Sequence, residues 1–127
     1  MLAWNDRPVR TTILIVDDHP GFRSRARALL EADGYEVVGE AADGASAIST
    51  SGDLRPDVIL LDVQLPDIDG FEVARRLAES GHRSAVVLTS SRDASDYGPR
   101  IARSAARGFV SKADLSGRAI QVLLEGG

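Results

Sequence analysis

The chain of 127 residues has no cysteine, which excludes a disulfide framework, a thiol nucleophile and any cysteine-ligated metal site. No apolar run approaches the length needed to cross a bilayer, and neither end has the pattern of a secretory signal peptide. Excess positive charge is also lacking, because the formal net charge is −4, so non-specific binding to nucleic acid or to anionic lipid has no electrostatic basis. We therefore expect a cytoplasmic domain that binds neither membranes nor, directly, nucleic acid.

Lysine is almost absent, since Lys112 is the only one among fifteen basic residues. It follows a short apolar run, Phe109-Val110, and so stands at the end of a predicted strand. A compact, flexible ammonium differs chemically from the planar guanidinium that supplies the other positive charges. This one retained lysine is therefore a candidate functional residue.

What the chain does contain is a regular alternation of apolar runs and segments with helical periodicity. The predicted strands cover residues 12–16, 35–41, 58–61, 85–88 and 108–111, and the predicted helices cover 20–32, 44–51, 70–80 and 99–106, with a last helix marked by apolar residues from 115 to 123. Five successive β–α units predict one α/β domain with a doubly wound, five-stranded parallel sheet and helices on both faces. Residues 1–10 are a polar segment that we predict to be a flexible leader.

Acidic residues stand directly after two of the predicted strands. Asp17 and Asp18 follow the first, and Asp62 follows the third, whose apolar composition indicates a central position. Each acid alone is typical of a turn or a helix cap. Parallel strands, however, bring their carboxyl ends to one edge of the sheet, where such folds bind ligands. Three carboxylates and Lys112 at that edge would suit a divalent metal and a phosphoryl group.

Three motifs occur in a fixed order: Ile15-Val16-Asp17-Asp18-His19-Pro20, then Leu60-Leu61-Asp62 with Pro66 and Gly70, then Gly108-Phe109-Val110-Ser111-Lys112. This succession resembles the receiver domain of two-component response regulators over about residues 11–125. The first and last motifs look most like receivers of the NarL/FixJ group, whose members usually carry a helix-turn-helix output domain; we expect none within this chain. The resemblance implies a flavodoxin-like (βα)5 fold with strand order 2-1-3-4-5.

The resemblance also implies roles for the acidic residues and the lysine. Asp62 would be the phosphoacceptor, and Lys112 would contact the phosphoryl oxygens. Mg²⁺ would be bound by Asp17, Asp18 and Asp62 together with the backbone carbonyl of Gln64, an oxygen donor set of the kind this ion prefers.

A switch hydroxyl and an aromatic residue complete the family pattern. The hydroxyl ends the fourth strand about 22 residues before the lysine, and this spacing selects Ser90, with Thr89 as the alternative. Phe109, three residues before Lys112, matches the aromatic whose rotamer changes on activation. Ala113 follows the lysine where the family often has proline, so we do not expect a cis peptide bond there.

The function implied is a phosphorylation-dependent signalling switch. A sensor histidine kinase or a phosphotransfer protein would supply the phosphoryl group, with the kinase facing the helix near Phe22–Ala26 and the loop near Ala113. The domain would catalyse its own Mg²⁺-dependent phosphorylation and dephosphorylation without being a conventional turnover enzyme. Homodimerisation on phosphorylation, and control of transcription through an output domain absent from this chain, are further expectations by family.

Two other functions are compatible with a similar fold. A receiver-like interaction module that is not phosphorylated would lack an acid or the lysine, and none is missing here. A metal-dependent phosphatase on a similar sheet would need Asp-x-Asp after the first strand, whereas this chain has Asp17-Asp18.

Overall fold

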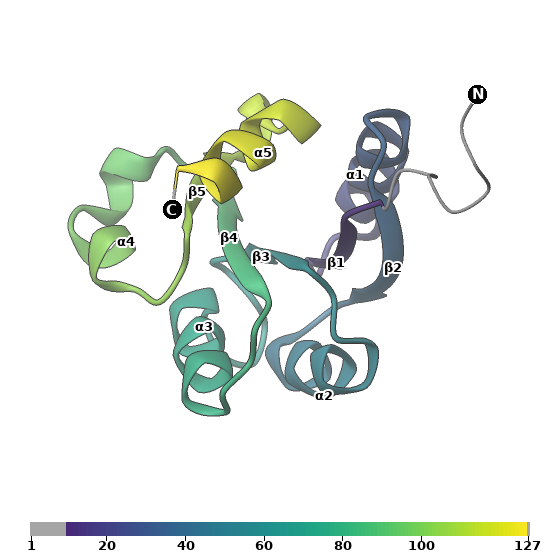
Figure 1. The fold of residues 1–127 in the computed structure, drawn as a ribbon. Helices are drawn as coiled ribbons and strands as arrows, with labels where there is room; N and C mark the ends of the chain where they lie inside the picture. Colours follow the sequence, from purple (N-terminus) through teal and green to yellow (C-terminus); the bar gives the residue numbers. More distant parts are fainter. Residues whose placement is uncertain (1–9, 127) are drawn as a thin grey trace, which may run out of the picture.

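A computed structural model describes residues 10–126, and within them one parallel sheet forms the centre (Figure 1). Its strands are β1 (Thr12–Val16), β2 (Glu36–Ala41), β3 (Val58–Asp62), β4 (Ala85–Ser90) and β5 (Gly108–Ser111). Their order is β2-β1-β3-β4-β5, and all pairings are parallel. The predicted fold class and strand order are confirmed. The predicted domain limits of 11–125 stay a prediction, and the predicted leader lies, except for Arg10, outside the described residues.

Helices cover both faces of the sheet. They are α1 (Pro20–Ala32), α2 (Gly44–Leu54), α3 (Gly70–Glu79), α4 (Arg100–Arg103) and α5 (Gly117–Glu125), with short 3-10 helices η2 (Ala94–Tyr97) and η3 (Lys112–Asp114). In Figure 1, α1 and α5 lie on one side of the sheet, while α2 and α3 lie on the other. No described helix is long and apolar enough to span a membrane.

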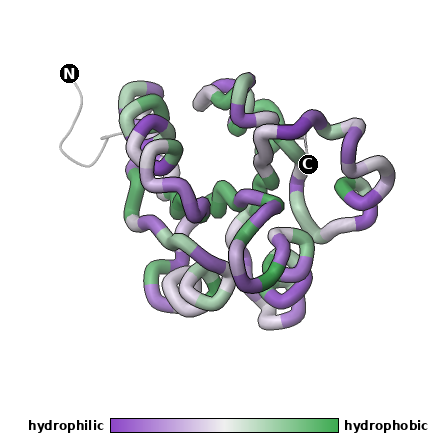
Figure 2. The backbone as a smooth tube through the Cα atoms, turned by 180° about the vertical axis from the view of Figure 1, so that it is seen from behind, coloured by the Kyte–Doolittle hydropathy of each residue, from purple (hydrophilic) through white to green (hydrophobic). Residues whose placement is uncertain are grey.

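Alternation along the strands divides the core into two apolar clusters, one on each face. Ile13, Ile15 and Leu60 belong to the cluster under α1 and α5, whereas Leu14 and Leu61 belong to the cluster under α2 and α3. Figure 2 shows the result as a hydrophobic centre surrounded by more hydrophilic helices. Because β1 and β3 are buried on both faces, the residues at their carboxyl ends are held in a rigid frame.

The main departure from the predicted elements lies between β4 and β5. A helix over 99–106 is predicted, but only Arg100–Arg103 is α-helical, and the unpredicted 3-10 helix η2 precedes it. Gly98, with a φ of 56°, separates the two. Ser104 ends α4 by adopting an extended backbone, and its hydroxyl donates to the Ile101 carbonyl at 2.6 Å. Local side-chain bonds of this kind compete with helix propagation.

The other boundaries differ by a few residues. α2 continues three residues beyond the predicted end at Ser51, and β4 continues two residues beyond Leu88. Leu115, predicted as part of the last helix, precedes α5 and is buried in the core instead. Ser116 caps α5 by accepting a hydrogen bond from the Ala119 amide at 3.0 Å, so the helix begins after Leu115.

Candidate functional site

Asp17 and Asp62 lie side by side at the carboxyl ends of the two central strands. β1 and β3 pair with Val16 opposite Leu61, so the next residue of each strand is an aspartate. Asp17 is fully buried and Asp62 is 2% exposed. Two carboxylates removed from water in this way need counter-charges or a metal ion.

Lys112 supplies the positive charge from the start of η3, directly after β5. Its Nζ lies 2.5 Å from Asp17 Oδ2 and 3.2 Å from Asp62 Oδ2. The ammonium also stands 4.4 Å from the centroid of the Phe22 ring of α1, a cation–π contact. The contact with Asp17 is an ion pair without hydrogen-bond geometry, and Oδ2 therefore has no hydrogen-bond donor although it is buried.

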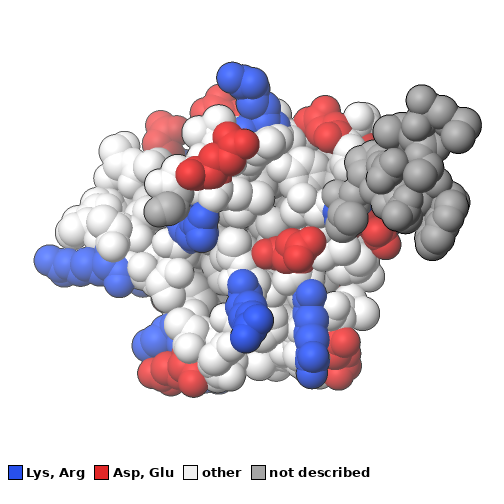
Figure 3. Space-filling model, viewed as in Figure 1, with Lys and Arg blue, Asp and Glu red and all other residues white. Residues whose placement is uncertain are grey.

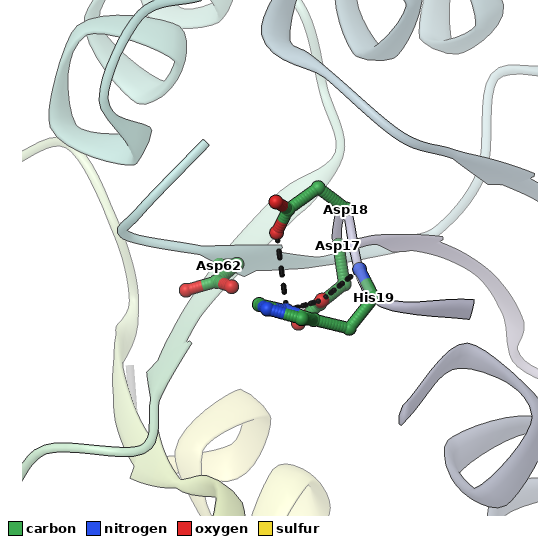
Figure 4. Close-up of side chains that lie close together, drawn as sticks. All are labelled: Asp17, Asp18, His19 and Asp62. Atoms are coloured by element: carbon green, nitrogen blue, oxygen red, sulfur yellow. Dashed lines mark hydrogen bonds and ion pairs between the residues drawn. The ribbon is translucent and has the colours of Figure 1, made fainter. Parts of the chain in front are cut away.

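Asp18 and His19 complete the cluster at its exposed rim (Figure 4). His19 precedes α1 at the N-cap position, and its side chain makes no capping hydrogen bond. The side chain is 68% exposed, but its Nδ1 contacts the cluster, 2.9 Å from Asp17 Oδ1 and 3.1 Å from Asp18 Oδ1. The sequence interpretation did not include this ring among the site residues. The only feature of the sequence that could have indicated this contact is the position of His19 two residues after Asp17.

Burial governs the protonation of the site. Burial raises the pKa of Asp62 to about 6, reinforced by the neighbouring charge of Asp17 and opposed by the Gln64 amide and Lys112. Burial also acts to raise the pKa of Asp17, but the ion pair with Lys112 and the hydrogen bonds from His19 outweigh burial and hold that pKa below its usual value. The pKa of Lys112 is raised because the two carboxylates outweigh the effect of burial. Perturbed groups gathered at one edge are characteristic of a functional site.

The oxygen atoms present fit a divalent cation. One ligand atom from each of Asp17, Asp18, Asp62 and His19 can be chosen so that all four lie within 4.8 Å of one another. Asp17 Oδ2 is buried, accepts no hydrogen bond and has Lys112 Nζ as its ion-pair partner, so it could also serve as a ligand. Carboxylates with open space for water are the ligands that Mg²⁺ prefers. The acidic cluster therefore has the donor chemistry that fits a divalent metal ion.

The loop that follows Asp62 is fixed at two points. Asp67 accepts hydrogen bonds from the Gly44 and Ala45 amides at the start of α2, at 2.8 and 2.9 Å. These two bonds lower the pKa of Asp67 to about 2. At the other end, a Cβ on Gly70 would lie 2.5 Å from the Asp62 carbonyl oxygen, so no other residue fits there. At the start of the loop, the Gln64 amide donates to Asp62 Oδ1 at 3.0 Å.

The two candidate hydroxyls at the end of β4 differ in their surroundings. Thr89 is paired with Asp62 across β3 and β4, so the two side chains share one face of the sheet. Its Oγ1 is buried and has no hydrogen-bond partner. Ser90 faces the opposite side, where its Oγ lies 2.6 Å from the hydroxyl of Tyr97. Phe109 is partly buried on that same side, in contact with the Tyr97 ring.

The site residues predicted from the sequence are thus only partly brought together. Asp17, Asp18, Asp62 and Lys112 form one cluster, and the Gln64 backbone borders it. Ser90 and Phe109 lie beside that cluster on the α3 side. No described peptide bond is cis, in agreement with the expectation for Ala113.

Comparison with known proteins agrees with this geometry. The family model of the response regulator receiver domain matches residues 13–122. The chain therefore belongs to the receiver domains of two-component response regulators, as its motifs indicate.

Individual relatives are response regulators and transcriptional regulators. The chain is 41% identical over 100 residues to a Pseudomonas aeruginosa protein named as a candidate transcriptional regulator, covering 79% of this chain and 48% of that protein. It is 32% identical over 99 residues to the DNA-binding transcriptional activator EvgA of Escherichia coli K12, covering 78% of this chain and 48% of EvgA. The chain thus spans about half the length of these relatives.

Solved structures show the same fold. The signal receiver domain of NarL, a candidate response regulator of Mycobacterium tuberculosis, is 33% identical with a TM-score of 0.83, covering 94% of this chain and all of that one. A LuxR-family two-component response regulator from Aurantimonas is 30% identical with a TM-score of 0.83, covering 93% of this chain and 87% of that one.

Proposed function

We propose that this receiver domain accepts a phosphoryl group on Asp62 in a reaction that needs Mg²⁺. The observation that carries the proposal is the buried pair of Asp17 and Asp62 with Lys112 between them, 2.5 and 3.2 Å from their oxygens. A carboxylate that attacks an anionic phosphoryl group needs positive charge around it more than it needs further covalent chemistry. This cluster has the lysine and the oxygen ligands for that purpose.

Each residue has a defined task in the proposal. Asp62 is the nucleophile: one of its oxygens forms a bond to phosphorus while the donor's histidine nitrogen leaves. Lys112, already 3.2 Å from Asp62 Oδ2, neutralises a phosphoryl oxygen. Asp17, Asp18, Asp62 and the carbonyl of Gln64 would hold Mg²⁺, which when bound offsets the repulsion between the acceptor carboxylate and the phosphoryl group.

The hydroxyl that stabilises the phosphoryl group is Thr89 in our proposal, in place of Ser90. Thr89 is in register with Asp62, and its buried Oγ1 has no partner, so a phosphoryl oxygen would satisfy it. Ser90 Oγ is already engaged by the Arg92 amide at 3.1 Å and by Tyr97. Substituting Thr89→Ala should slow phosphorylation by about 10²-fold or more, the usual effect of losing one such donor, whereas Ser90→Ala should not.

The phosphoryl donor is a sensor histidine kinase or a phosphotransfer protein. Phe22 and Ala26 of α1 line one open pocket together with Lys112 and Ala113, beside the acidic cluster. This pocket supports docking of the donor where its histidine can reach Asp62. By analogy with the relatives, the phosphorylated domain would control transcription through a part not contained in this chain, and homodimerisation on phosphorylation stays a prediction.

Intact mass after incubation with acetyl phosphate tests the proposal. One added phosphoryl group is expected for the wild type with Mg²⁺, and none is expected with EDTA or for Asp62→Asn. Asp69→Asn is the matched control, since Asp69 caps α3 on the same loop and should not prevent the adduct. A wild type that binds neither Mg²⁺ nor phosphoryl would contradict the proposal and favour an interaction module that works without phosphorylation.

A further inference from the structure

Tyr97 makes an unusual contact for a residue of an exposed 3-10 helix. Its hydroxyl lies 2.6 Å from Oγ of Ser90, the fully buried last residue of β4. The other residues of η2, Ala94–Asp96, are exposed. Tyr97 is therefore the residue that ties η2 to the sheet.

Aromatic packing fixes the ring of Tyr97 from two sides. Phe71 of α3 and Phe109 of β5 each have their ring centroid 5.8 Å from that of Tyr97, with interplanar angles of 65° and 53°. The edge-to-face contact with Phe71 and the tilted contact with Phe109 restrict the orientation of the ring. The hydroxyl is thus presented to Ser90 in a single direction.

The end of β4 is held in place by this contact. The Ser90 hydroxyl oxygen receives the Arg92 amide at 3.1 Å and pairs with Tyr97 at 2.6 Å. The preceding residue, Thr89, has a buried Oγ1 without a partner, in register with Asp62. Because Thr89 and Ser90 are adjacent, a shift of Thr89 toward a group on Asp62 would also move Ser90. The 2.6 Å hydrogen bond between Ser90 and Tyr97 would then lengthen and weaken.

We propose that Tyr97 is a positioning residue that favours the unphosphorylated arrangement of β4 through Ser90. This proposal rests on the proposed function, because it needs a phosphoryl group on Asp62 to draw Thr89 inward. A bond made only in one state shifts the equilibrium toward that state. Removing it raises the fraction of molecules that are ready to bind the phosphoryl group, and the apparent affinity rises by the same factor.

The variant Tyr97→Phe tests this, since it removes the hydroxyl and keeps the ring between its aromatic neighbours. The probe is beryllofluoride with Mg²⁺, a mimic of the phosphoryl group on a carboxylate, and its dissociation constant is measured by calorimetry. We expect Tyr97→Phe to bind the probe about fivefold more tightly than the wild type, the factor that one ordinary net hydrogen bond represents. We also expect a lower midpoint of urea unfolding without the probe.

Tyr35→Phe is the matched control. The Tyr35 hydroxyl donates to the Gly117 carbonyl at 2.8 Å in a buried hydrogen bond that is not part of the site. Its loss should lower the urea midpoint as Tyr97→Phe does, and should leave the affinity for the probe unchanged. A purely structural role for Tyr97 would make the two variants alike, and this result would overturn the proposal.

Ser90→Ala removes the same bond from its other end. It should tighten binding as Tyr97→Phe does, and the double variant should gain no more than either single one. Weaker binding by Ser90→Ala would instead make Ser90 the phosphoryl-binding hydroxyl and overturn the proposal. A wild type that does not bind the probe would overturn the proposed function as well, whereas binding that is equal in the wild type and Tyr97→Phe overturns the role of Tyr97 alone.

Discussion

Two groups of charged residues in this domain use the same chemistry in different surroundings. On the exposed face of α3, Glu72 is bonded to Arg75 and Arg76, at 2.8 Å for Arg76. At the carboxyl edge of the sheet, Asp17 and Asp62 share Lys112 in a buried cluster. Figure 3 shows surface charges of both signs dispersed over the visible face, as is ordinary for a protein exterior.

Glu72 of the exposed group and Asp62 of the buried group differ in the direction of their pKa shifts. Hydrogen bonds from Arg75 and Arg76 lower the pKa of Glu72 to about 2, whereas burial raises the pKa of Asp62 to about 6 in spite of Lys112. A nearby cation is therefore not sufficient to lower the pKa of a buried carboxylate, since Lys112 contacts both Asp17 and Asp62 and only the pKa of Asp17 is lowered. The exposed ion pairs contribute modestly to helix stability. In the buried group the negative charge on Asp62 is unfavourable, and binding of a metal ion or a phosphoryl group would offset it.

The largest effect is expected from Lys112→Ala, which removes the cation from the buried group. Two buried carboxylates are then left without their partner, which typically costs about 3 kcal/mol. Urea unfolding without metal at pH 7.5 measures the loss. Arg75→Ala removes a cation from the exposed group and should have a far smaller effect. Equal losses in the two variants would contradict the contrast between the groups.

Asp62→Asn should act in the opposite direction and stabilise the metal-free domain. A pKa raised from 3.8 to about 6 means that the folded state binds more protons between these values. Stability contributed by protonated Asp62 is thus fully present below pH 3.8 and is lost as pH rises through about 6. At pH 7.5 the neutral amide should recover up to about 3 kcal/mol. Thermal unfolding of both proteins at pH 7.5 and pH 4 checks this, since the difference should shrink at the lower pH.

Mg²⁺ binding should weaken on acidification, because protons compete for the same carboxylate. With the pKa of Asp62 near 6, the apparent dissociation constant should be about tenfold higher at pH 5 than at pH 7.5. Calorimetric titrations at both values measure the ratio. Asp62→Asn is the control, with weaker binding and a flatter dependence on pH. A wild-type affinity that does not vary over this range would show that Asp62 is not a ligand.

The smallest effect is expected from Glu72→Gln on α3. The side chain is solvent-exposed enough for salt to screen its ion pairs with Arg75 and Arg76. The variant should unfold at a slightly lower temperature in dilute buffer, and the difference should vanish in about 1 M NaCl, where the screening length is a few ångströms. A difference that persists at high salt would mean that Glu72 acts mainly through its place in the first turn of the helix.

The fold could be predicted from the sequence because its strong signals are local. The apolar runs of β1 and β3 and the aspartates after them are adjacent in sequence, and parallel topology alone brings Asp17 and Asp62 together. The segment between β4 and β5 was predicted less well. Its short helices depend on Gly98 and on side-chain bonds from Ser104 that apolar periodicity does not reveal.

The choice between Ser90 and Thr89 was also affected by the irregular segment between β4 and β5. Counting back from Lys112 assumes a fixed length for the connection from β4 to β5, which is the irregular part of the chain. Strand register does not depend on that length, and it aligns Thr89 with Asp62. The contacts of the His19 ring with Asp17 and Asp18 likewise depend on the backbone before α1, where the His19 amide donates to Asp17 Oδ1 at 2.8 Å.

The attachment of the Asp62 loop to α2 has a consequence for the direction in which a signal leaves the site. Asp67 and Gly70 anchor the loop on one side, through two amide bonds at α2 and close packing against the Asp62 carbonyl. On the other side, the end of β4 is retained by side-chain contacts of Ser90. The Asp62 loop is held by backbone amides and close packing, whereas the end of β4 is held by side-chain hydrogen bonds. We therefore expect a change at Asp62 to displace the end of β4 more than the loop. If Asp62 is phosphorylated as proposed, we expect the resulting displacement to run through the end of β4 toward Tyr97 and β5.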